Sequence, residues 1–362
     1  MKLLSVAATV AHAGDHDGRA IPVIGIQTDS RLAGWGEAQA SRAPEAICAI
    51  VRHLLNPVLR DRSFRGERKE VESIWDQMYE LMRDEGESGG LIAEAIGAVD
   101  MALWDLAGKI QNRTIGQIIN NGGHVSEVKA FVSMDAAAPG NLMSDALALR
   151  AEGFDVFELE RTRTEGELLA ALDILKSAMG KSGRVAVNAR WLHSNWDTLF
   201  ERQIDQREPM WIANPFAADD PFAYERLFKA MCTPIAAGEL YHTHHELAPL
   251  LHEMAIGVLQ PDLGRCGITE AIRMADMAKS HDLPVVVRVD ESVGPQLAAS
   301  LQFAAIAPGR RVEYNLNTLK MANSALAQPI KIQQGKYEVP TGPGLGIDIE
   351  EPELHLMEIP AA

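Results

Sequence analysis

Acidic side chains alternate with apolar ones in residues 156–160, which read VFELE. This alternation predicts a short β-strand that carries Glu158 and Glu160 on the same face. Two carboxylates with unequal pKa values can act as a general acid and a general base, and clustered carboxylates can also bind a divalent cation. Either chemistry needs further polar groups beside Glu158 and Glu160.

Polar residues also follow other short apolar segments of the chain. From about residue 127 onward, strand-like segments alternate with helix-like segments such as 165–179 and 268–281, a pattern typical of a parallel α/β barrel. The eight predicted strands are 128–134, 156–160, 185–190, 210–215, 234–239, 257–262, 284–289 and 311–315.

The carboxyl ends of barrel strands are where such folds carry their active sites. The residues at these predicted ends are Glu158, Glu160, Asn188, Arg190, Ala213, Asn214, Glu239, Asp262, the region 287–291 and Glu313. A barrel interior is normally filled with Val, Ile and Leu, so these residues predict a functional cavity. The alternative interpretation places them in loops, where polar residues are ordinary.

The first third of the chain has a different organisation. Residues 21–29 alternate as a half-buried strand, and Gly34 and Gly36 predict a turn after it. Residues 42–84 follow a helical pattern, and residues 91–110 predict a long helix that is apolar on most sides and therefore mostly buried.

Composition excludes several classes of protein. The chain has 362 residues, 47% of them hydrophobic, and a net charge of −16, which disfavours nucleic acid as a partner. No apolar run reaches the ~18 residues of a membrane-spanning helix. The opening residues 1–14 have a weak resemblance to a secretory signal. They are equally consistent with a first strand. Three cysteines without a metal or redox spacing indicate reduced thiols and a cytoplasmic protein.

Four longer motifs carry a resemblance to a known family. They are GWGEA at 34–38, AIGAVDMALWDLAGK at 95–109, the segment 238–285 that begins GELYHTHHE, and VPTGPGLGIDI at 339–349. The chain resembles the enolase superfamily in its mandelate racemase / muconate lactonizing enzyme branch, and most closely the galactonate dehydratase-like members.

This resemblance implies a modified (β/α)₇β barrel covered by an α+β capping domain. The barrel is expected over residues 127–328. The capping domain is expected over residues 1–126, completed by the C-terminal segment 329–362. The family abstracts a proton next to a carboxylate, with a Lys or His as base and Mg²⁺ stabilising the enediolate.

The metal positions of the family fall on Asn188, Ala213 and Glu239. Asn188 is a neutral amide and Ala213 has no ligand atom, so Glu239 is the one ligand of three that is retained. The resemblance thus implies Mg²⁺ for the family, whereas we expect no cofactor for this chain.

The base positions are also altered. The Lys-x-Lys pair falls on Glu158 and Glu160, and no lysine occurs between Lys129 and Lys176. The dyad aspartate is present as Asp262, but its histidine partner, expected between Val287 and Asp290, is absent. After His281 the one remaining histidine is His355. Glu313 matches a family glutamate that donates a hydrogen bond to the substrate carboxylate.

Two arrangements could hold the crowded carboxylates. We expect Arg190, with Arg288, to bridge Glu239 and one of Glu158 or Glu160, because a guanidinium suits paired carboxylates. The competing arrangement is a rebuilt metal site of Glu158, Glu160 and Glu239.

Two other motifs resemble sites without predicting one. The HTHHE run, residues 242–246, is interpreted as a solvated helix start rather than a metal cluster, although His242 could reach the cavity mouth. Cys266 is expected to pack in a turn, since no histidine is near it in sequence. The loops at 11–20 and 85–90 correspond to specificity loops, and the first is shorter than the usual lid of the family.

Two functions remain open. The first is a member with a degenerate active site that binds a small carboxylate or acid-sugar ligand, forms an oligomer (a dimer or octamer in the family), or has no catalytic task. The second is a rewired acid-sugar dehydratase or epimerase, a lyase or isomerase. It would use Glu158, Glu160 or Asp290 as acid and base, with arginines that hold the substrate. Whether the chain is an enzyme is therefore left open.

Overall fold

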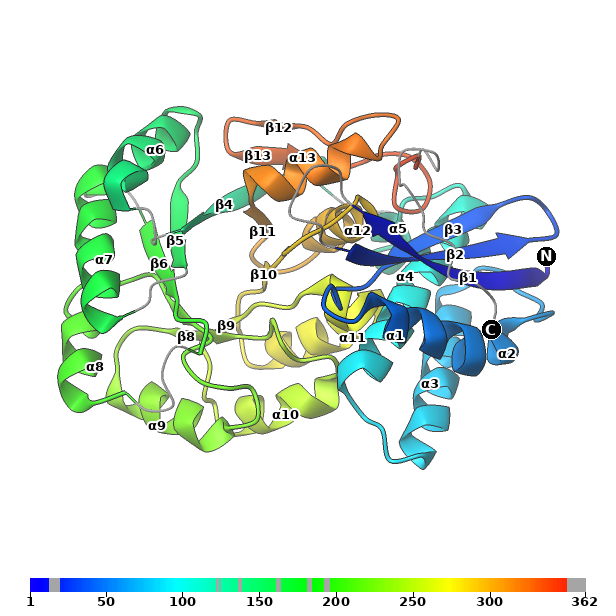
Figure 1. Ribbon diagram of the computed structural model, residues 1–362, viewed down its shortest axis with the longest axis horizontal. Coiled ribbons are helices and arrows are strands. Elements are labelled where there is room, and N and C mark those ends of the chain that lie inside the picture. The colour runs from blue at the N-terminus through cyan, green and yellow to red at the C-terminus, as the bar shows by residue number, and fades with distance from the viewer. Residues whose placement is uncertain are drawn as a thin grey trace.

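The computed structural model describes residues 1–12, 20–121, 123, 125–135, 139–160, 164–180, 184–191 and 196–349. An N-terminal part and a strand-and-helix part lie side by side (Figure 1). The N-terminal part contains an antiparallel sheet of order β1-β2-β3, formed by β1 (Leu3–His12), β2 (Ala20–Thr28) and β3 (Ala33–Glu37). The opening residues thus form a strand, as one of the two sequence interpretations expected.

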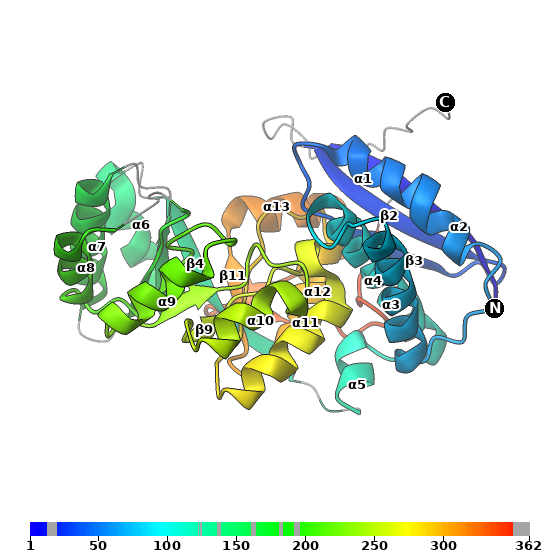
Figure 2. The ribbon, with the colours of Figure 1, turned by 90° about the horizontal axis from the view of Figure 1, so that it is seen from below.

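Helices pack against this sheet (Figure 2): α1 (Pro44–Ile50), the π-helical turn η1 (Val51–Leu55), α2 (Asn56–Leu59) and α4 (Gly90–Gln111). Helix α3 (Arg68–Asp84) packs on α4, and α5 (Ile115–Ile119) packs on α4 and on α12 (Pro295–Ala304) of the second part. Helix α4 is buried over most of its length because it packs against both β3 and the second part of the molecule. The prediction of a long buried helix over 91–110 is confirmed.

The turn predicted at Gly34 and Gly36 was wrong, because both glycines lie inside strand β3. Their role is close packing. A Cβ atom on Gly34 would lie 2.2 Å from the carbonyl oxygen of Ala102, and one on Gly36 would lie 1.9 Å from that of Ala98. Glycine therefore lets β3 lie directly against the backbone of α4.

We expect Gly36→Ala to lower the free energy of unfolding by at least ~1–3 kcal/mol, since the added methyl must push β3 away from α4. Urea denaturation measures this effect. Gly166→Ala is the control: it lies in a helix with no atom within 4 Å of the added Cβ, and should be neutral or stabilising by up to ~1 kcal/mol. Equal stability of G36A and the wild type would contradict the close packing.

The second part carries eight parallel strands, in the order β10-β11-β4-β5-β6-β7-β8-β9. Each lies within or overlaps a strand predicted from the sequence. They are β4 (Glu127–Asp135), β5 (Val156–Glu160), β6 (Arg184–Asn188), β7 (Ile212–Ala213), β8 (Ile235–Ala237), β9 (Val258–Leu259), β10 (Val286–Val287) and β11 (Arg311–Tyr314). Strands β9 and β10 are linked by the isolated bridges Leu259–Val285 and Asp262–Arg288 rather than by a strand ladder.

Helices alternate with these strands and lie outside them (Figures 1 and 2). They are α6 (Pro139–Ala151), α7 (Glu165–Met179), α8 (Thr198–Asp205), α9 (Pro221–Ala230), α10 (His244–His252), α11 (Leu263–Ser280), α12 (Pro295–Ala304) and α13 (Leu316–Ser324). In the described residues, no helix is both long and apolar enough to cross a membrane.

The two parts are joined closely through α4 and α11. Gly267 has a left-handed φ of 73° and kinks α11, and a Cβ on Gly97 would lie 2.8 Å from the Gly267 nitrogen. Beyond the kink, the Asp100 carboxylate accepts hydrogen bonds of 2.8 Å from the backbone N–H groups of Ile268 and Thr269. An acidic residue of the first part thus accepts hydrogen bonds from the backbone N–H groups at the start of a helical segment in the second part.

The C-terminal segment contacts both parts. Its hairpin, β12 (Ile332–Gln333) and β13 (Lys336–Glu338), pairs antiparallel with β4 rather than with the N-terminal sheet. Further on, the Leu345 N–H donates to Asp105 of α4 at 2.9 Å. Near residue 345 the segment therefore contacts the first part. The hairpin instead extends the strand system of the second part.

The interior beneath the strand ends is apolar. Phe131, Val156, Ala186, Trp211, Ala213, Ala236, Val258 and Val286 form a cluster contributed by successive strands. The alanines leave room for the Trp211 ring, which packs edge-on against Phe131 with centroids 5.9 Å apart. This apolar cluster lies next to the polar site at the strand ends, since its Trp211 hydrogen-bonds to Glu158.

Candidate functional site

Arg288 lies at the centre of the predicted cavity and is 2% exposed. Its guanidinium is ion-paired with Glu158, and a terminal nitrogen lies 2.5 Å from Glu160. Its Nε lies 3.2 Å from Glu313 and 3.5 Å from Glu239. We call Arg288 and these four carboxylates the arginine plug.

Neutral donors hold the same carboxylates. The backbone N–H of Arg190 donates to Asn188 Oδ1 at 3.1 Å, which fixes the amide so that Nδ2 lies 3.4 Å from both Glu160 and Glu239. Asn214 Nδ2 donates to Glu239 at 2.6 Å. Both amides thus present hydrogen atoms, not oxygen lone pairs, to the carboxylates.

Two residues contact the arginine plug from neighbouring strands. The Trp211 indole N–H donates to Glu158, and Ser133 hydrogen-bonds to Glu313. The Arg288 guanidinium also lies over the Phe131 ring, 5.6 Å from its centroid, a favourable cation–π arrangement. The terminal nitrogens of the buried cation and one face of its plane therefore have partners, whereas its Nε forms ion pairs but no hydrogen bond among the described residues.

The predicted arginine bridge is present, but the two arginines divide it unequally. Arg190 contributes one ion pair, of 2.8 Å, to Glu160, whereas Arg288 contacts Glu239 and both Glu158 and Glu160. Arg190 and Trp191 have left-handed φ values of 43° and 58° at the end of β6. This strained backbone is typical of functional sites and positions Arg190 beside Glu160.

Burial and charge shift several pKa values in opposite directions. Burial alone would lower the pKa of Arg288, but the surrounding carboxylates raise it well above its ordinary value, so the group stays charged. Burial raises the pKa of Glu158 and raises that of Glu313 to about 8, although Arg288 opposes both shifts. We therefore expect Glu313 to bind a proton more readily than a solvated glutamate does.

Asp262 lies beside the arginine plug at the start of α11. Its Oδ1 accepts hydrogen bonds from Gln296 at 2.6 Å and from the Gly264 N–H at 2.8 Å. Its Oδ2 is buried and has no hydrogen-bond partner among the described residues. Burial raises the pKa of Asp262 to about 8, against the opposing charge of Arg265.

A cavity of about 650 Å³ lies between the N-terminal part and these strand ends. The N-terminal part supplies residues 39–43 and the start of α4, and the second part supplies Arg190, Arg265 and Asp290. The cavity therefore contains a guanidinium-lined wall, and we call it the arginine cavity. Its position between the two parts is typical of ligand sites.

His242 lies at the edge of this region and not in the arginine plug. Its ring nitrogens lie 3.4 Å from Glu94 and 3.4 Å from Glu246. Burial lowers its pKa, but these carboxylates raise it to about 9. The HTHHE run forms the capped start of α10, with Thr243 as N-cap, but the expected solvation does not extend to Thr243, which is buried, or to His242, whose side chain is 12% exposed. Cys266 is buried in α11.

Of the two loops that the resemblance assigns to specificity, residues 85–90 are described, and residues 13–19 of the first loop lie outside the described residues. The second loop contacts the second part, since a Cβ on Gly89 would lie 2.2 Å from a carboxylate oxygen of Glu246. It also leads into Leu91, which lines the arginine cavity.

The residues that the family resemblance assigns to the metal positions do not fit Mg²⁺, which requires a near-octahedral shell of oxygen ligands. Ala213 has no ligand atom, Asn188 presents its N–H groups, and Glu239 faces Arg288 and Asn214. The competing rebuilt site is disfavoured on the same ground, because Glu158, Glu160 and Glu239 are each paired with Arg288. Among the described residues, no cluster of three or more His, Cys, Asp or Glu is arranged for a metal.

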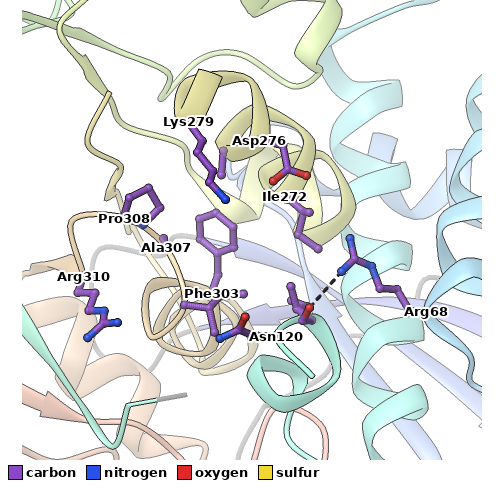
Figure 3. Close-up of a pocket in the computed structure, with 12 residues that line it drawn as sticks. Arg68, Asn120, Ile272, Asp276, Lys279, Phe303, Ala307, Pro308 and Arg310 are labelled. Atoms are coloured by element: carbon purple, nitrogen blue, oxygen red, sulfur yellow. Dashed lines mark hydrogen bonds between the residues drawn. The ribbon is translucent and has the colours of Figure 1, made fainter. Parts of the chain in front are cut away.

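A second hollow of about 400 Å³ lies elsewhere, beside α11 and α12 (Figure 3). Arg310, on its wall, directly precedes β11 and so marks the amino end of that strand. The side chain of Arg68 closes part of it by donating to the carbonyl oxygen of Ile119 at 3.1 Å. This hollow is therefore at the opposite end of the strands from the arginine plug.

Several residues of the site were missed from the sequence. Ser133 and Trp211 precede or lie within apolar strands and carry no local signal. Gln39, which donates to the Glu291 carbonyl at 2.7 Å, is separated from it by more than 250 residues. Arg265 could have been found, because it follows Asp262 by one helical turn.

Comparisons with known proteins agree with this architecture. The model of the mandelate racemase / muconate lactonizing enzyme N-terminal domain matches residues 9–120, and that of the enolase C-terminal-like domain matches residues 141–353. The 3,6-anhydro-D-galactonate cycloisomerase from Zobellia galactanivorans has a similar fold, with a TM-score of 0.88 at 22% identity over 99% of this chain and 100% of that one.

Two curated relatives are similar along nearly their whole length. The D-galactarolactone cycloisomerase of Agrobacterium fabrum (strain C58) is 29% identical over 368 residues, covering 95% of this chain and 93% of the relative. The D-galactonate dehydratase of Klebsiella pneumoniae (strain 342) is 25% identical over 349 residues, covering 91% and 88%.

Proposed function

The chain belongs to the mandelate racemase / muconate lactonizing enzyme family of the enolase superfamily, and from this we propose that it is a metal-independent member in which the Arg288 guanidinium takes the place of the divalent cation. In this proposal the protein binds a small organic acid and does not catalyse the Mg²⁺-dependent proton abstraction of the family. The observation that carries the proposal is the contact of one buried arginine with four carboxylates.

Charge supports this substitution. A guanidinium provides five N–H donors in a plane and can satisfy several carboxylates at once. The surrounding carboxylates raise the pKa of Arg288 well above its ordinary value, so the group stays charged at neutral pH. A permanent cation at this position neutralises carboxylates as a metal would, but it has no open coordination position for a substrate oxygen.

The residues at the base positions also support the proposal. Abstraction of a proton next to a carboxylate needs a base whose pKa is near the working pH and whose atoms face the substrate. Glu158 and Glu160 are both paired with Arg288 and buried. Removal of one charge-stabilising group already lowers a catalytic rate by about 10²–10³-fold. The combined changes at these positions therefore leave no route for the proton abstraction that the family catalyses.

A second candidate is a metal-independent acid/base enzyme, and one observation favours it. Among the described residues, Asp262 Oδ2 is buried without a hydrogen-bond partner, 4.0 Å from the Arg265 Nε, and burial raises the pKa of Asp262 to about 8. The nearby Asp290 lines the arginine cavity. A buried carboxyl group of raised pKa beside a second carboxyl group, next to a ligand cavity, is an arrangement that acid/base catalysis uses. An acid sugar, the kind of compound named for the curated relatives, would be the substrate.

Calorimetric titration of the chelator-treated protein with Mn²⁺ and Mg²⁺ tests the proposal. We expect no saturable heat of binding up to millimolar metal. Tight binding at one site per chain would overturn the proposal. Turnover of D-galactonate or D-galactarolactone by the same sample, with EDTA present, would instead support the second candidate.

A further inference from the structure

The hollow of about 400 Å³ beside α11 and α12 lies at the amino ends of the strands (Figure 3), and we call it the amino-end hollow. It is separate from the arginine plug and from the arginine cavity, which lie at the carboxyl ends of the strands. Its volume is within the range of small-molecule sites. The second part of the molecule lines it with apolar side chains, those of Ile272, Ala275, Phe303, Ile306, Ala307 and Pro308.

Two cations on the wall of this hollow have no partner among the described residues. Lys279, in the last turn of α11, and Arg310, directly before β11, both line the hollow and are exposed. Neither side chain forms an ion pair or a hydrogen bond with another described residue. Figure 3 shows the Lys279 side chain pointing from α11 toward the centre of the hollow, with Arg310 farther out. An ammonium group with unused donors therefore faces the apolar lining.

Cations near helix ends often bind the last carbonyl groups of a helix, but the carbonyl groups here already have donors. Those of Ala278 and Lys279, at the end of α11, accept hydrogen bonds from backbone N–H groups of residues 281–283. That of Phe303, in α12, accepts from the N–H groups of residues 306 and 307. Satisfying these helix ends therefore does not account for the two cations.

We propose that the amino-end hollow binds a small monocarboxylate with an apolar body, such as an aromatic acid. The carboxylate of the ligand pairs with the Lys279 ammonium. Its apolar body contacts the Phe303 ring, which is 2% exposed, and the aliphatic side chains around this ring. An aromatic ring of the ligand gains an additional stacking interaction with Phe303.

The charges of the hollow determine the class of ligand. Lys279 and Arg310 stand against one carboxylate on the lining, that of Asp276. Arg68, on the opposite wall, is already paired with Glu72 at 2.7 Å. One positive charge is therefore left over, which matches a monoanion. A second acid group on the ligand would face Asp276 without a further cation to offset the repulsion.

The test compares compounds that differ in one group, with 2-naphthoate as the probe. Titration calorimetry should show one molecule bound per chain, with a Kd of about 1 mM or tighter. Three compounds should each bind at least about tenfold more weakly: acetate, which lacks the apolar body, 2-naphthylmethanol, which lacks the charge, and 2,6-naphthalenedicarboxylate, which has a second acid group. Absence of saturable 2-naphthoate binding would overturn the inference. Equal or tighter binding of the dicarboxylate would overturn the monocarboxylate class.

Variants assign the two halves of the ligand. Lys279→Met retains the apolar stem of the side chain and should weaken 2-naphthoate by about tenfold without changing 2-naphthylmethanol binding. Ala275→Leu introduces a good helix former that fills the hollow, and should abolish binding of both compounds. Lys320→Met is the control, because Lys320 is an exposed lysine of α13 outside the hollow. Wild-type affinity in K279M would contradict the role of Lys279.

Hydrogen exchange shows where the probe binds. Saturating 2-naphthoate should slow the exchange of backbone amides in residues 272–280 and 303–310. Protection confined to residues 39–43 and 188–191 would place the probe in the arginine cavity and overturn the inference. The inference is independent of the proposed function, because it uses no residue of the arginine plug. We therefore expect the same affinity for 2-naphthoate in EDTA and in Mg²⁺.

Discussion

Replacing Arg288 by alanine should lower the free energy of unfolding by at least ~3–5 kcal/mol, because it leaves buried carboxylates without their cation. Native proteins are stable by only ~5–15 kcal/mol, so this variant is expected to unfold near physiological temperature. The effect arises from electrostatics rather than from the lost volume: Glu158, Glu160, Glu239 and Glu313 all contact this one guanidinium. Urea denaturation of both proteins measures the difference.

Arg207→Ala is the matched control. Arg207 also forms a two-pronged ion pair, with Asp173 at 2.8 Å, but the pair is at the surface. Exposed pairs contribute about 0–1 kcal/mol, so R207A should be close to the wild type. Millimolar Ca²⁺ should raise the melting temperature of R288A and leave the wild type unchanged, since the vacated carboxylates can then bind a cation. R288A with wild-type stability would contradict the role of the arginine plug.

Glu313→Gln should make the stability of the protein less dependent on pH. The pKa of Glu313 is raised from 4.5 to about 8 by burial, so between these values the folded protein holds a proton that the unfolded chain has released. The stability contribution is complete below pH 4.5 and is lost as the pH rises through 8. The loss is ~1.4 kcal/mol per pH unit for this single group.

Glutamine reproduces the protonated form of Glu313. Its oxygen can accept from the Val289 N–H, which lies 3.0 Å from Glu313 Oε2, and its amide can donate to Ser133. Unfolding free energies measured from pH 5 to pH 8 should therefore fall less in E313Q than in the wild type, by several kcal/mol over the range. Parallel profiles would show that Glu313 is ionised throughout.

Asp155→Asn provides the control of opposite sign. Burial raises the pKa of Asp155, but the hydrogen bond and charge of Arg311 outweigh this effect and lower it below 3.8. Its contribution to stability is present above pH 3.8 and is lost as the pH falls. D155N should therefore be less stable than the wild type by a constant amount from pH 5 to pH 8.

The strands and long helices could be predicted from the sequence because their signals are local. In residues 156–160 apolar and acidic side chains alternate, and this pattern can be recognised within the segment itself. The apolar pattern of residues 91–110 is likewise that of a buried helix. The same local signals failed at Gly34 and Gly36. These glycines allow strand β3 to contact a helix about 65 residues later in the sequence, and they do not form a turn.

The content of the site could be predicted only in part. The strand-end rhythm identified Glu158, Glu160 and Glu239, and charge balance suggested arginines as their partners. Which arginine takes the centre depends on side-chain directions at the ends of β6 and β10, which the sequence does not specify. The left-handed backbone at Arg190 directs it toward the rim, while Arg288 points inward.

The pairing of β13 with β4 has a consequence for biosynthesis. Residues 127–129 of β4 find their antiparallel partners in residues 336–338, which leave the ribosome about 200 residues later. At synthesis rates of ~5–20 residues per second, the edge of the first barrel strand stays uncovered for roughly ten seconds or more. An uncovered strand edge invites pairing with other chains, so this nascent protein has a window in which chaperone protection matters most.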